Sequence, residues 1–192
     1  MPRPSRSRTR LEPGVRREQI LDAADTVFRD RAPGDVTFEA VAEAADVSRA
    51  LLYNYFGDRK GLLAAIEVRA LRRLDDALLA VLDPSLEPAQ QLRPLANAYV
   101  EFSKAHGQTW RVLAATGATD HPSVHAARRT RVERLAALWG GTDAAKVAAH
   151  TVTLLLEAVT MDGLDGRIDT DAAVDVVCQI LTDGLERAGV RT

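Results

Sequence analysis

Cysteine, lysine and aromatic residues are all scarce in this chain of 192 residues. The single cysteine, Cys178, excludes an internal disulfide and is compatible with a reducing cytoplasm. Because it lies in the apolar run AAVDVVCQIL, we expect a small core residue rather than a reactive thiol. An excess of charge of one sign is lacking as well. The net charge is −2, so any affinity for nucleic acid must come from a local basic patch.

Segments that span a membrane and the short motifs of common enzymes are also missing. The most apolar stretch, residues 147–161, is interrupted by His150 and Glu157 and is shorter than the roughly 20 residues that a bilayer requires. There is no nucleotide-binding glycine loop and no nucleophile elbow. His121 and His125 have the spacing of a metal pair but no third ligand nearby. We therefore expect a cytoplasmic protein that is not an enzyme, with no membrane contact, no metal, no cofactor and no catalytic residues.

The hydrophobic pattern predicts an all-α fold, because no useful stretch alternates as a strand does. Apolar residues recur at helical spacing instead, and Pro and Gly residues separate the periodic segments. The predicted architecture is an N-terminal three-helix helix-turn-helix domain followed by a C-terminal helical ligand-binding and dimerisation domain. Helices are expected at residues 15–31, 38–45, 59–82, 89–106, 109–116, 122–139, 144–161 and 171–188, with one more between Ser48 and Asp58.

Three regions follow from this pattern. Residues 1–13 carry arginines without apolar periodicity and form a disordered basic arm, for which a solvated tail and a DNA-tracking segment are both open. Residues 14–60 form the helix-turn-helix DNA-binding domain. Residues 61–192 form the helical effector-binding and dimerisation domain.

The segment TFEAVAEAADVSRALLYNYF has the features of two short helices joined by a tight turn. Thr37 and Ser48 are suited to cap the two helices. Ala42 and Ala45 are small enough for close helix packing, and Asp46 stands where the chain must turn. Such a hairpin is common on its own, so the function depends on what its second helix presents.

That second helix divides its residues between packing and recognition. Leu52 and Phe56 share one face and are expected to anchor the helix to its own domain. Arg49 and Asn54 project elsewhere and are the candidates for reading bases. The hydroxyls of the neighbouring tyrosines and the charges of two following basic residues are suited to phosphate oxygens; these are Tyr53, Tyr55, Arg59 and Lys60.

The stretch RREQILDAADTVFRD…VTFEAVAEAADVSRALLYNYFGDRKGLLAAI resembles the N-terminal DNA-binding domain of the TetR family of bacterial transcriptional regulators. The resemblance covers about residues 16–66. It departs from the family pattern at Asp46 and Ala50, where glycine is usual, at Leu51, where a hydroxyl is usual, and at Arg59, where lysine is usual. Leu51 either contacts a thymine methyl group or packs inward. The resulting set of DNA-contacting residues is Thr37, Ser48, Arg49, Ala50, Leu51, Tyr53, Asn54, Tyr55, Arg59 and Lys60.

The resemblance also implies a C-terminal domain that binds a small-molecule effector and forms a homodimer. Two helices that are apolar on more than one face need partners beyond a single core. The predicted dimer interface comprises Val152, Leu156, Val159, Val174, Val177 and Leu181. Large side chains and one acid of the middle helices are the predicted ligand-binding residues, namely Tyr99, Phe102, Trp110, Leu113, Trp139, Glu157 and Met161.

The function predicted from the sequence is a ligand-responsive transcriptional regulator. It would bind a palindromic operator in double-stranded DNA as a homodimer, repress transcription, and be released by a small molecule. Two other hypotheses remain open at this point: an all-helical adaptor that does not bind DNA, and a small helical enzyme that uses a C-terminal pocket.

Overall fold

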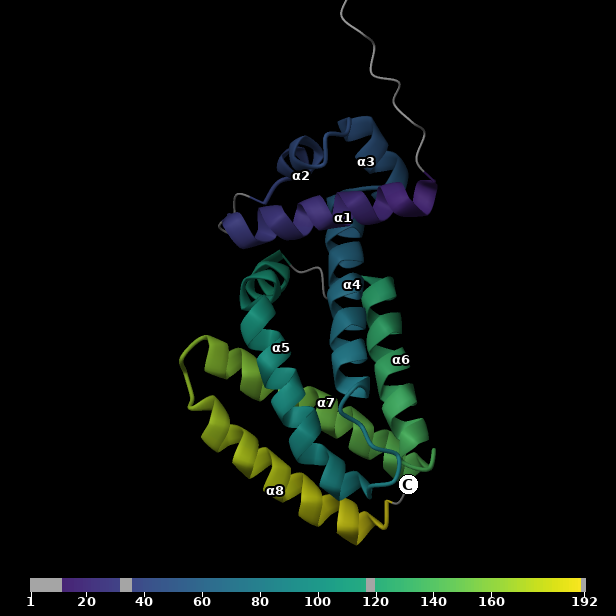
Figure 1. Ribbon diagram of the computed structural model, residues 1–192, viewed down its shortest axis with the longest axis vertical. Helices are drawn as coiled ribbons and strands as arrows, with labels where there is room; N and C mark the ends of the chain where they lie inside the picture. Colours follow the sequence, from purple (N-terminus) through teal and green to yellow (C-terminus); the bar gives the residue numbers. More distant parts are fainter. Residues whose placement is uncertain (1–11, 32–35, 117–119, 191–192) are drawn as a thin grey trace, which may run out of the picture.

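A computed structural model describes residues 12–31, 36–116 and 120–190, and in these ranges every regular element is a helix (Figure 1). The all-α prediction is therefore confirmed. The helices are α1 (Pro13–Asp30), α2 (Phe38–Ala44), α3 (Arg49–Phe56), α4 (Arg59–Leu79), α5 (Pro88–Thr116), α6 (Pro122–Leu138), α7 (Asp143–Leu164) and α8 (Thr170–Ala188). The predicted basic arm at residues 1–13 falls almost wholly outside the described residues.

Side-chain caps fix the starts of the short N-terminal helices, as the sequence predicted. The hydroxyl of Thr37 accepts a hydrogen bond from the Ala40 amide at 3.1 Å, and that of Ser48 accepts from the Leu51 amide at 3.2 Å. The carboxylate of Asp58 accepts from the Gly61 amide at 2.8 Å. Between α2 and α3, Asp46 adopts a positive φ of 50°, a conformation that Asp tolerates better than most residues. The caps and this turn set the angle at which α3 leaves α2.

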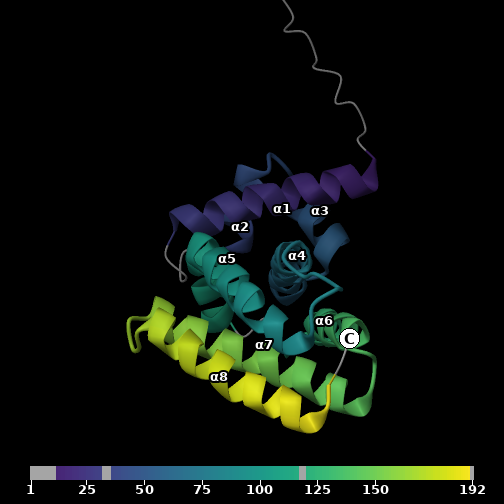
Figure 2. The ribbon, with the colours of Figure 1, turned by 60° about the horizontal axis from the view of Figure 1, so that its bottom comes forward.

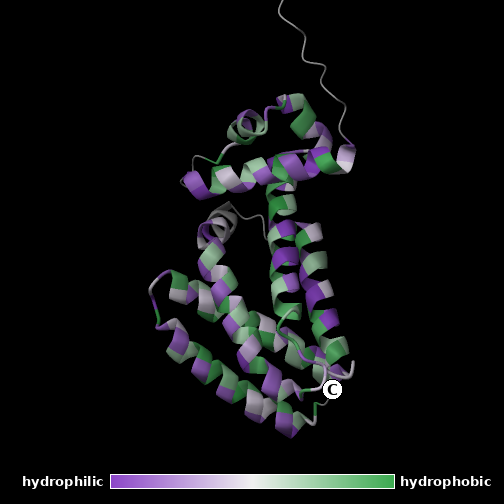
Figure 3. Ribbon diagram, viewed as in Figure 1, coloured by the Kyte–Doolittle hydropathy of each residue, from purple (hydrophilic) through white to green (hydrophobic). Residues whose placement is uncertain are grey.

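The predicted DNA-binding domain has its own hydrophobic core, which continues into α4. Leu52 and Phe56 of α3 are buried in it, as predicted from their spacing. Leu62, Leu63 and Ile66 from the first turns of α4 complete it. Further along, Leu74 and Leu78 of the same helix belong to the C-terminal core. Figure 3 shows α4 green at its start and more polar where it leaves the first core. The helix α4 is thus shared by both domains.

A cluster of charged residues joins α4 to α1. The guanidinium of Arg69, a buried side chain, pairs with Asp22 at 2.8 Å and with Asp25 at 2.6 Å. It also donates to the carbonyl of Leu21. Arg73, one turn further, pairs with Asp25 at 2.7 Å. Because Arg69 is buried and bonded to several groups, α1 and the upper half of α4 are held as one unit.

The C-terminal domain surrounds the lower part of α4. Figure 1 shows α5 and α6 on either side of α4, with α7 and α8 crossing below. Turning the molecule brings α7 and α8 forward as an adjacent pair that forms an outer layer (Figure 2). The two helices predicted at 89–106 and 109–116 correspond to the two parts of α5, which meet at a kink where His106 has non-helical backbone angles. Its last turns, after this kink, approach α1.

The outer layer buries most of the predicted dimer-interface residues within the single chain. Five of the six chosen residues are buried in the core of the single chain, and Val159 is half-buried against it. The core positions are Val152, Leu156, Val174, Val177 and Leu181. Both helices do carry a second apolar face, as the two-sided pattern required, but it consists of other residues. The exposed apolar side chains of α7 and α8 are Val147, Leu154, Val176 and Ile180.

The helix α7 has the length and apolar composition of a bilayer-crossing helix, and only 22% of its most apolar window is buried. The same composition occurs in core helices of proteins that never enter a membrane. Lys146 and Glu157 of α7 both form ion pairs within the chain. The exposed apolar surface of α7 needs a partner to cover it.

Candidate DNA-binding surface and internal cavity

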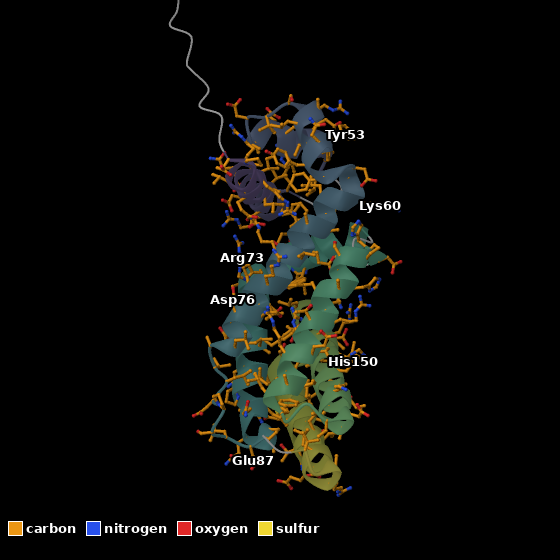
Figure 4. All side chains as sticks on the ribbon, turned by 90° about the vertical axis from the view of Figure 1, so that its right-hand side faces the viewer. Tyr53, Lys60, Arg73, Asp76, Glu87 and His150 are labelled. Carbon is orange, nitrogen blue, oxygen red and sulfur yellow. The ribbon has the colours of Figure 1, made fainter. Side chains whose placement is uncertain are left out.

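The helix α3 presents a polar surface because its apolar residues are turned inward. Tyr53 is 49% exposed, and its ring packs on Phe38 of α2 with centroids 4.8 Å apart. This packing holds the Tyr53 hydroxyl in place. Figure 4 shows Tyr53 and Lys60 on the same side of the N-terminal end of the molecule. Five further predicted positions are exposed there or beside it, namely Thr37, Ser48, Arg49, Ala50 and Asn54.

Arg49, a predicted base-reading residue, already has a partner on the neighbouring helix. Its Nη2 lies 2.5 Å from Oε1 of Glu39 on α2, and both side chains are more than half exposed. An exposed pair of this kind is worth little, about 0.2–1 kcal/mol, so DNA can displace it at small cost. The sequence did not indicate this pairing, although Glu39 and Arg49 come close in any hairpin of this geometry.

Arg59 differs from its expected role in part. Its Nη2 donates to the carbonyl of Val36 at 3.3 Å and so ties the start of α4 to the segment before α2. The residue remains exposed, so the rest of its guanidinium is open to a phosphate. Leu51 and Tyr55 are half-buried, and Tyr55 packs against the domain core. Both predicted contacts are therefore less accessible than Tyr53 or Asn54.

A close approach between α3 and α4 requires glycine at one position. A Cβ atom at Gly61 would lie 2.0 Å from the backbone oxygen of Phe56. Since a backbone atom cannot step aside as a side chain can, any other residue must displace the first turn of α4 from the end of α3. Gly61 thus sets the position of the recognition helix relative to α4.

An internal cavity lies in the C-terminal domain between α4, α5 and α7. Its volume is about 20 Å³, which is room for roughly one water molecule. Four of the predicted ligand-binding residues meet there, namely Tyr99, Trp110, Glu157 and Met161. The structure adds Leu71, Ser103 and Thr160, which the sequence analysis missed. A signal existed, because Ser103 follows Tyr99 by four residues and Thr160 follows Glu157 by three, which places each pair on one helix face.

Two other predicted ligand residues, Phe102 and Trp139, lie elsewhere. The ring of Phe102 stacks on that of His106 with centroids 4.1 Å apart. Trp139 is fully buried at the end of α6, in the C-terminal core. The side chain of Leu113 lies outside the described part of the chain. The predicted site is therefore smaller and closer to α4 than the sequence suggested.

A second, larger hollow adjoins the first at Tyr99. Its volume is about 30 Å³, and it is lined mainly by leucines of α4 and α5 and by residues of α6 and α7. Arg131 and Asp75 form a buried ion pair in its wall. Tyr99 lines both hollows and so separates them. Burial raises the pKa of the Tyr99 hydroxyl, which therefore stays neutral and can donate a hydrogen bond.

A charged triad connects the cavity wall to α4. Arg128 of α6 binds both oxygens of Glu157 at 2.8 and 2.9 Å, and its Nη2 also lies 3.4 Å from Oε1 of Glu67. Glu67 is fully buried on α4, and this burial raises the pKa of its carboxyl group although Arg128 opposes the shift. The cavity acid Glu157 is thus linked through one guanidinium to the helix that enters the DNA-binding domain.

Two polar atoms of the cavity wall have no hydrogen-bond partner within the described residues. These are Nε1 of Trp110 and Oγ1 of Thr160, and both atoms are buried. Unpaired buried polar groups cost about 1–3 kcal/mol each, so they mark places where a ligand or a water molecule can bind.

Trp110 occupies an unusual place among the cores. It packs against the core of the DNA-binding domain, the core of the C-terminal domain, and a small cluster of Ala64, Leu71 and Val124 between them. Close by, Nε2 of Gln108 donates to the carbonyl of Arg31 at the end of α1, at 3.3 Å. The end of α5 therefore contacts both the cavity and the DNA-binding domain.

The two histidines with the spacing of a metal pair, His121 and His125, contact neighbouring residues of the chain. Nδ1 of His121 accepts from the Ser123 amide and caps α6. His125 lies 4.0 Å from Asp120. In the part of the chain that the structure describes, no three His, Cys, Asp or Glu side chains gather as metal ligands would.

Comparison with known proteins identifies the family to which these features belong. Residues 20–66 match the family model described as "Bacterial regulatory proteins, tetR family". A crystal structure of a TetR-like transcriptional regulator from Rhodococcus sp. RHA1 is 32% identical, covers 92% of this chain and 99% of that chain, and superposes with a TM-score of 0.62.

Two curated relatives agree. An uncharacterised HTH-type transcriptional regulator of Mycobacterium tuberculosis is 32% identical over 121 residues, a match that covers 63% of this chain and 58% of that protein. The HTH-type transcriptional activator FasR of Mycolicibacterium smegmatis is 27% identical over 194 residues, covering 94% and 88%. The match to the first thus spans little more than half of that relative's length.

Proposed function

We propose that this chain, which belongs to the TetR family of bacterial transcriptional regulators, represses transcription from a palindromic operator and is released by a small molecule. The family is one of DNA-binding helix-turn-helix regulators and not of enzymes. The proposal has three parts: the chain binds the operator as a homodimer, it represses transcription, and a ligand releases it.

The ligand response depends most on Trp110. This side chain lines the internal cavity and also packs against the core that holds α3 in place. A molecule that enters the cavity must contact or displace the indole ring, and the DNA-binding domain then loses or changes a packing partner. A coupling of about 1–3 kcal/mol between the two sites is typical of such linkage and changes operator affinity roughly 5- to 150-fold.

The helix α4 offers a second route for the same signal. Its first turns belong to the DNA-binding core, and Arg69 and Arg73 clamp it to α1. Glu67 connects it through Arg128 to the acid in the cavity wall. A shift of α4 therefore carries the whole DNA-binding domain, which alters the separation of two recognition helices in a dimer.

Dimerisation is supported by the exposed apolar face of α7 and α8. Val176 and Ile180 are 55% and 61% exposed, and Leu154 and Val147 lie on the partner helix of the same layer. A groove of about 880 Å³ runs between the two helices and includes Val147 and Gly184. A second copy, related by a two-fold axis, would cover this face with the same residues, as isologous interfaces do. It would also account for the low burial of α7.

Operator binding would divide the exposed residues of α3 by role. Arg49 and Asn54 read base edges, Arg49 after leaving Glu39. Tyr53 and Lys60 bind phosphates, so changing them weakens binding to all sequences alike. Because phosphate contacts release counterions, affinity should fall steeply as salt rises.

Gel-shift titrations of the full chain on its own upstream DNA, at several salt concentrations, test DNA binding. We expect salt-sensitive, saturable binding that weakens on Tyr53→Phe combined with Lys60→Ala. Salt-independent or absent binding would instead favour the helical adaptor. A promoter fused to a reporter tests the direction, and higher expression in the presence of the chain would contradict repression and match the activator named among the relatives.

A further inference from the structure

We propose that the cavity between α4, α5 and α7 binds a small neutral molecule that is mostly apolar and presents a carbonyl-type oxygen to Trp110 and Thr160. This inference rests on the proposed ligand response and names the chemical class of the ligand. It follows from the hydrogen-bonding state, the charge and the size of the cavity.

The unpaired groups in the cavity wall are donors that need an acceptor. Nε1 of Trp110 can only donate, and the hydroxyl of Thr160 can donate as well as accept. Thr160 is 2% exposed, so bulk water does not serve it. The charged acceptor of the wall is already used, because both oxygens of Glu157 bind Arg128. A ligand that carries an oxygen acceptor can satisfy Trp110, which a ligand that carries only donors cannot, and it can also accept from Thr160.

Charge around the cavity disfavours an anion. Glu157 lies in the wall and Glu67 lies behind Arg128, so two carboxyl groups share one guanidinium. Arg131 is occupied by Asp75 in the adjoining hollow. A carboxylate ligand would therefore enter a site in which negative charge is already in excess, at a distance where little water screens it.

A cation is disfavoured for a different reason. It would have to displace Arg128 from Glu157 to reach an acceptor, which breaks a bidentate pair and leaves Glu67 without its partner. The remaining walls are apolar or aromatic, namely Leu71, Met161 and the ring of Tyr99. A neutral molecule needs no such rearrangement.

The size of the cavity limits the ligand. Its volume of about 20 Å³ leaves room for roughly one water-sized group such as a carbonyl oxygen, so the rest of a ligand enters only where flexible side chains such as Met161 move aside. Acetophenone, benzoate and benzamidinium have nearly the same size and shape. They differ as a neutral acceptor, an anionic acceptor and a cationic donor, so they form a matched set of probes.

Binding of these probes is measured by tryptophan fluorescence in the Trp139→Phe variant, in which Trp110 is the remaining tryptophan, and by calorimetry on the unmodified chain. We expect acetophenone to change the fluorescence saturably and to bind at least tenfold more tightly than benzoate or benzamidinium. The Thr160→Val change, which keeps the shape and removes the hydroxyl, should weaken acetophenone about fivefold, the equivalent of one hydrogen bond. Thr130→Val, on the exposed side of α6, is the matched control and should leave the affinity unchanged.

Three results would overturn the inference: equal or tighter binding of either charged probe, unchanged affinity in Thr160→Val, or no binding of any probe to the folded chain. Gel shifts with acetophenone separate this inference from the proposed function. Binding in the cavity without release of DNA leaves the ligand class standing and counts against the ligand response. Release of DNA by a charged compound whose effect persists in Thr160→Val contradicts the ligand class and leaves the regulator intact.

Discussion

Replacing Arg128 by methionine should destabilise the protein in a strongly pH-dependent way. The change keeps a long side chain but removes the only guanidinium that faces Glu67 in the described structure, and Glu67 is fully buried. A buried carboxylate without a partner takes up a proton instead of staying charged. Its folded-state pKa then lies far above the unfolded value, near 4.5.

The free energy needed to protonate Glu67 sets an upper limit to the loss of stability. Neutralising a carboxyl group of ordinary pKa 4.5 costs about 1.4 kcal/mol per pH unit above this value, or about 3.4 kcal/mol at pH 7. Burial already raises the pKa of Glu67 in the unmodified chain, so part of this cost is present before the change. We therefore expect a loss of about 2–3 kcal/mol at pH 7. Glu157 is one-third exposed, and solvent limits its contribution to less than about 1 kcal/mol.

The sign of the pH dependence follows from the raised pKa. A group whose folded pKa exceeds its unfolded pKa contributes full stability below the unfolded value and loses that contribution as pH rises. The difference between Arg128→Met and the unmodified chain should therefore shrink to below about 1 kcal/mol at pH 5. Urea unfolding followed by circular dichroism, at one protein concentration and at pH 5, 6, 7 and 8, measures it.

The double variant Arg128→Met, Glu67→Gln provides the control. It removes the titrating group, so the pH dependence of the difference should vanish and at least half of the lost stability should return at pH 7. An equal loss at pH 5 and pH 7 in the single variant would refute the reasoning. It would mean that Arg128 stabilises the fold by packing its aliphatic stem and not by neutralising Glu67.

Three further predictions concern the recognition surface and the outer layer. Gly61→Ala should lower the stability by about 1–3 kcal/mol in thermal unfolding, because the added Cβ would meet a backbone oxygen. Gly14→Ala is the control: the added Cβ has free space there, so the change should be neutral or slightly stabilising. Equal effects of the two changes would contradict the close approach of α3 and α4. Ile180→Glu should convert the dimer to a monomer, as measured by light scattering, and should weaken operator binding. Val81→Glu, also at an exposed apolar position, is the control and should remain dimeric. A dimeric Ile180→Glu variant would place the interface elsewhere. Glu39→Ala frees Arg49 of α3 and should tighten operator binding about two- to fivefold in gel shifts. Weaker binding would mean that the ion pair positions Arg49 for DNA.

The local structure of the DNA-binding domain could be predicted well because its signals lie within a few residues of one another. A hydroxyl that caps a helix bonds an amide three residues later, so Thr37 and Ser48 could be identified from their place at the helix starts. The turn at Asp46 and the inward face formed by Leu52 and Phe56 are equally local. The recognition roles assigned to particular side chains remain predictions.

Contacts between distant helices were not predictable in the same way. Arg128 joins residues 61 positions before it and 29 positions after it, and no spacing rule connects them. The cavity was found only in part, because the pattern shows which residues are large but not which face a gap. The pattern shows that α7 and α8 are apolar on more than one face. Which face is buried within the chain depends on the packing of α5 against α8, and the pattern does not contain that information.

The position of Trp110 limits how this protein can change its ligand. Because one indole ring packs against three clusters, a substitution that adapts it to another molecule also disturbs the DNA-binding core. Met161 and Ser103 line the same cavity, and neither is a member of that core. Laboratory selection for new ligands should therefore accumulate changes at Met161 and Ser103 first and leave Trp110 in place. The ring would remain as the invariant sensor, while its neighbours define what it senses.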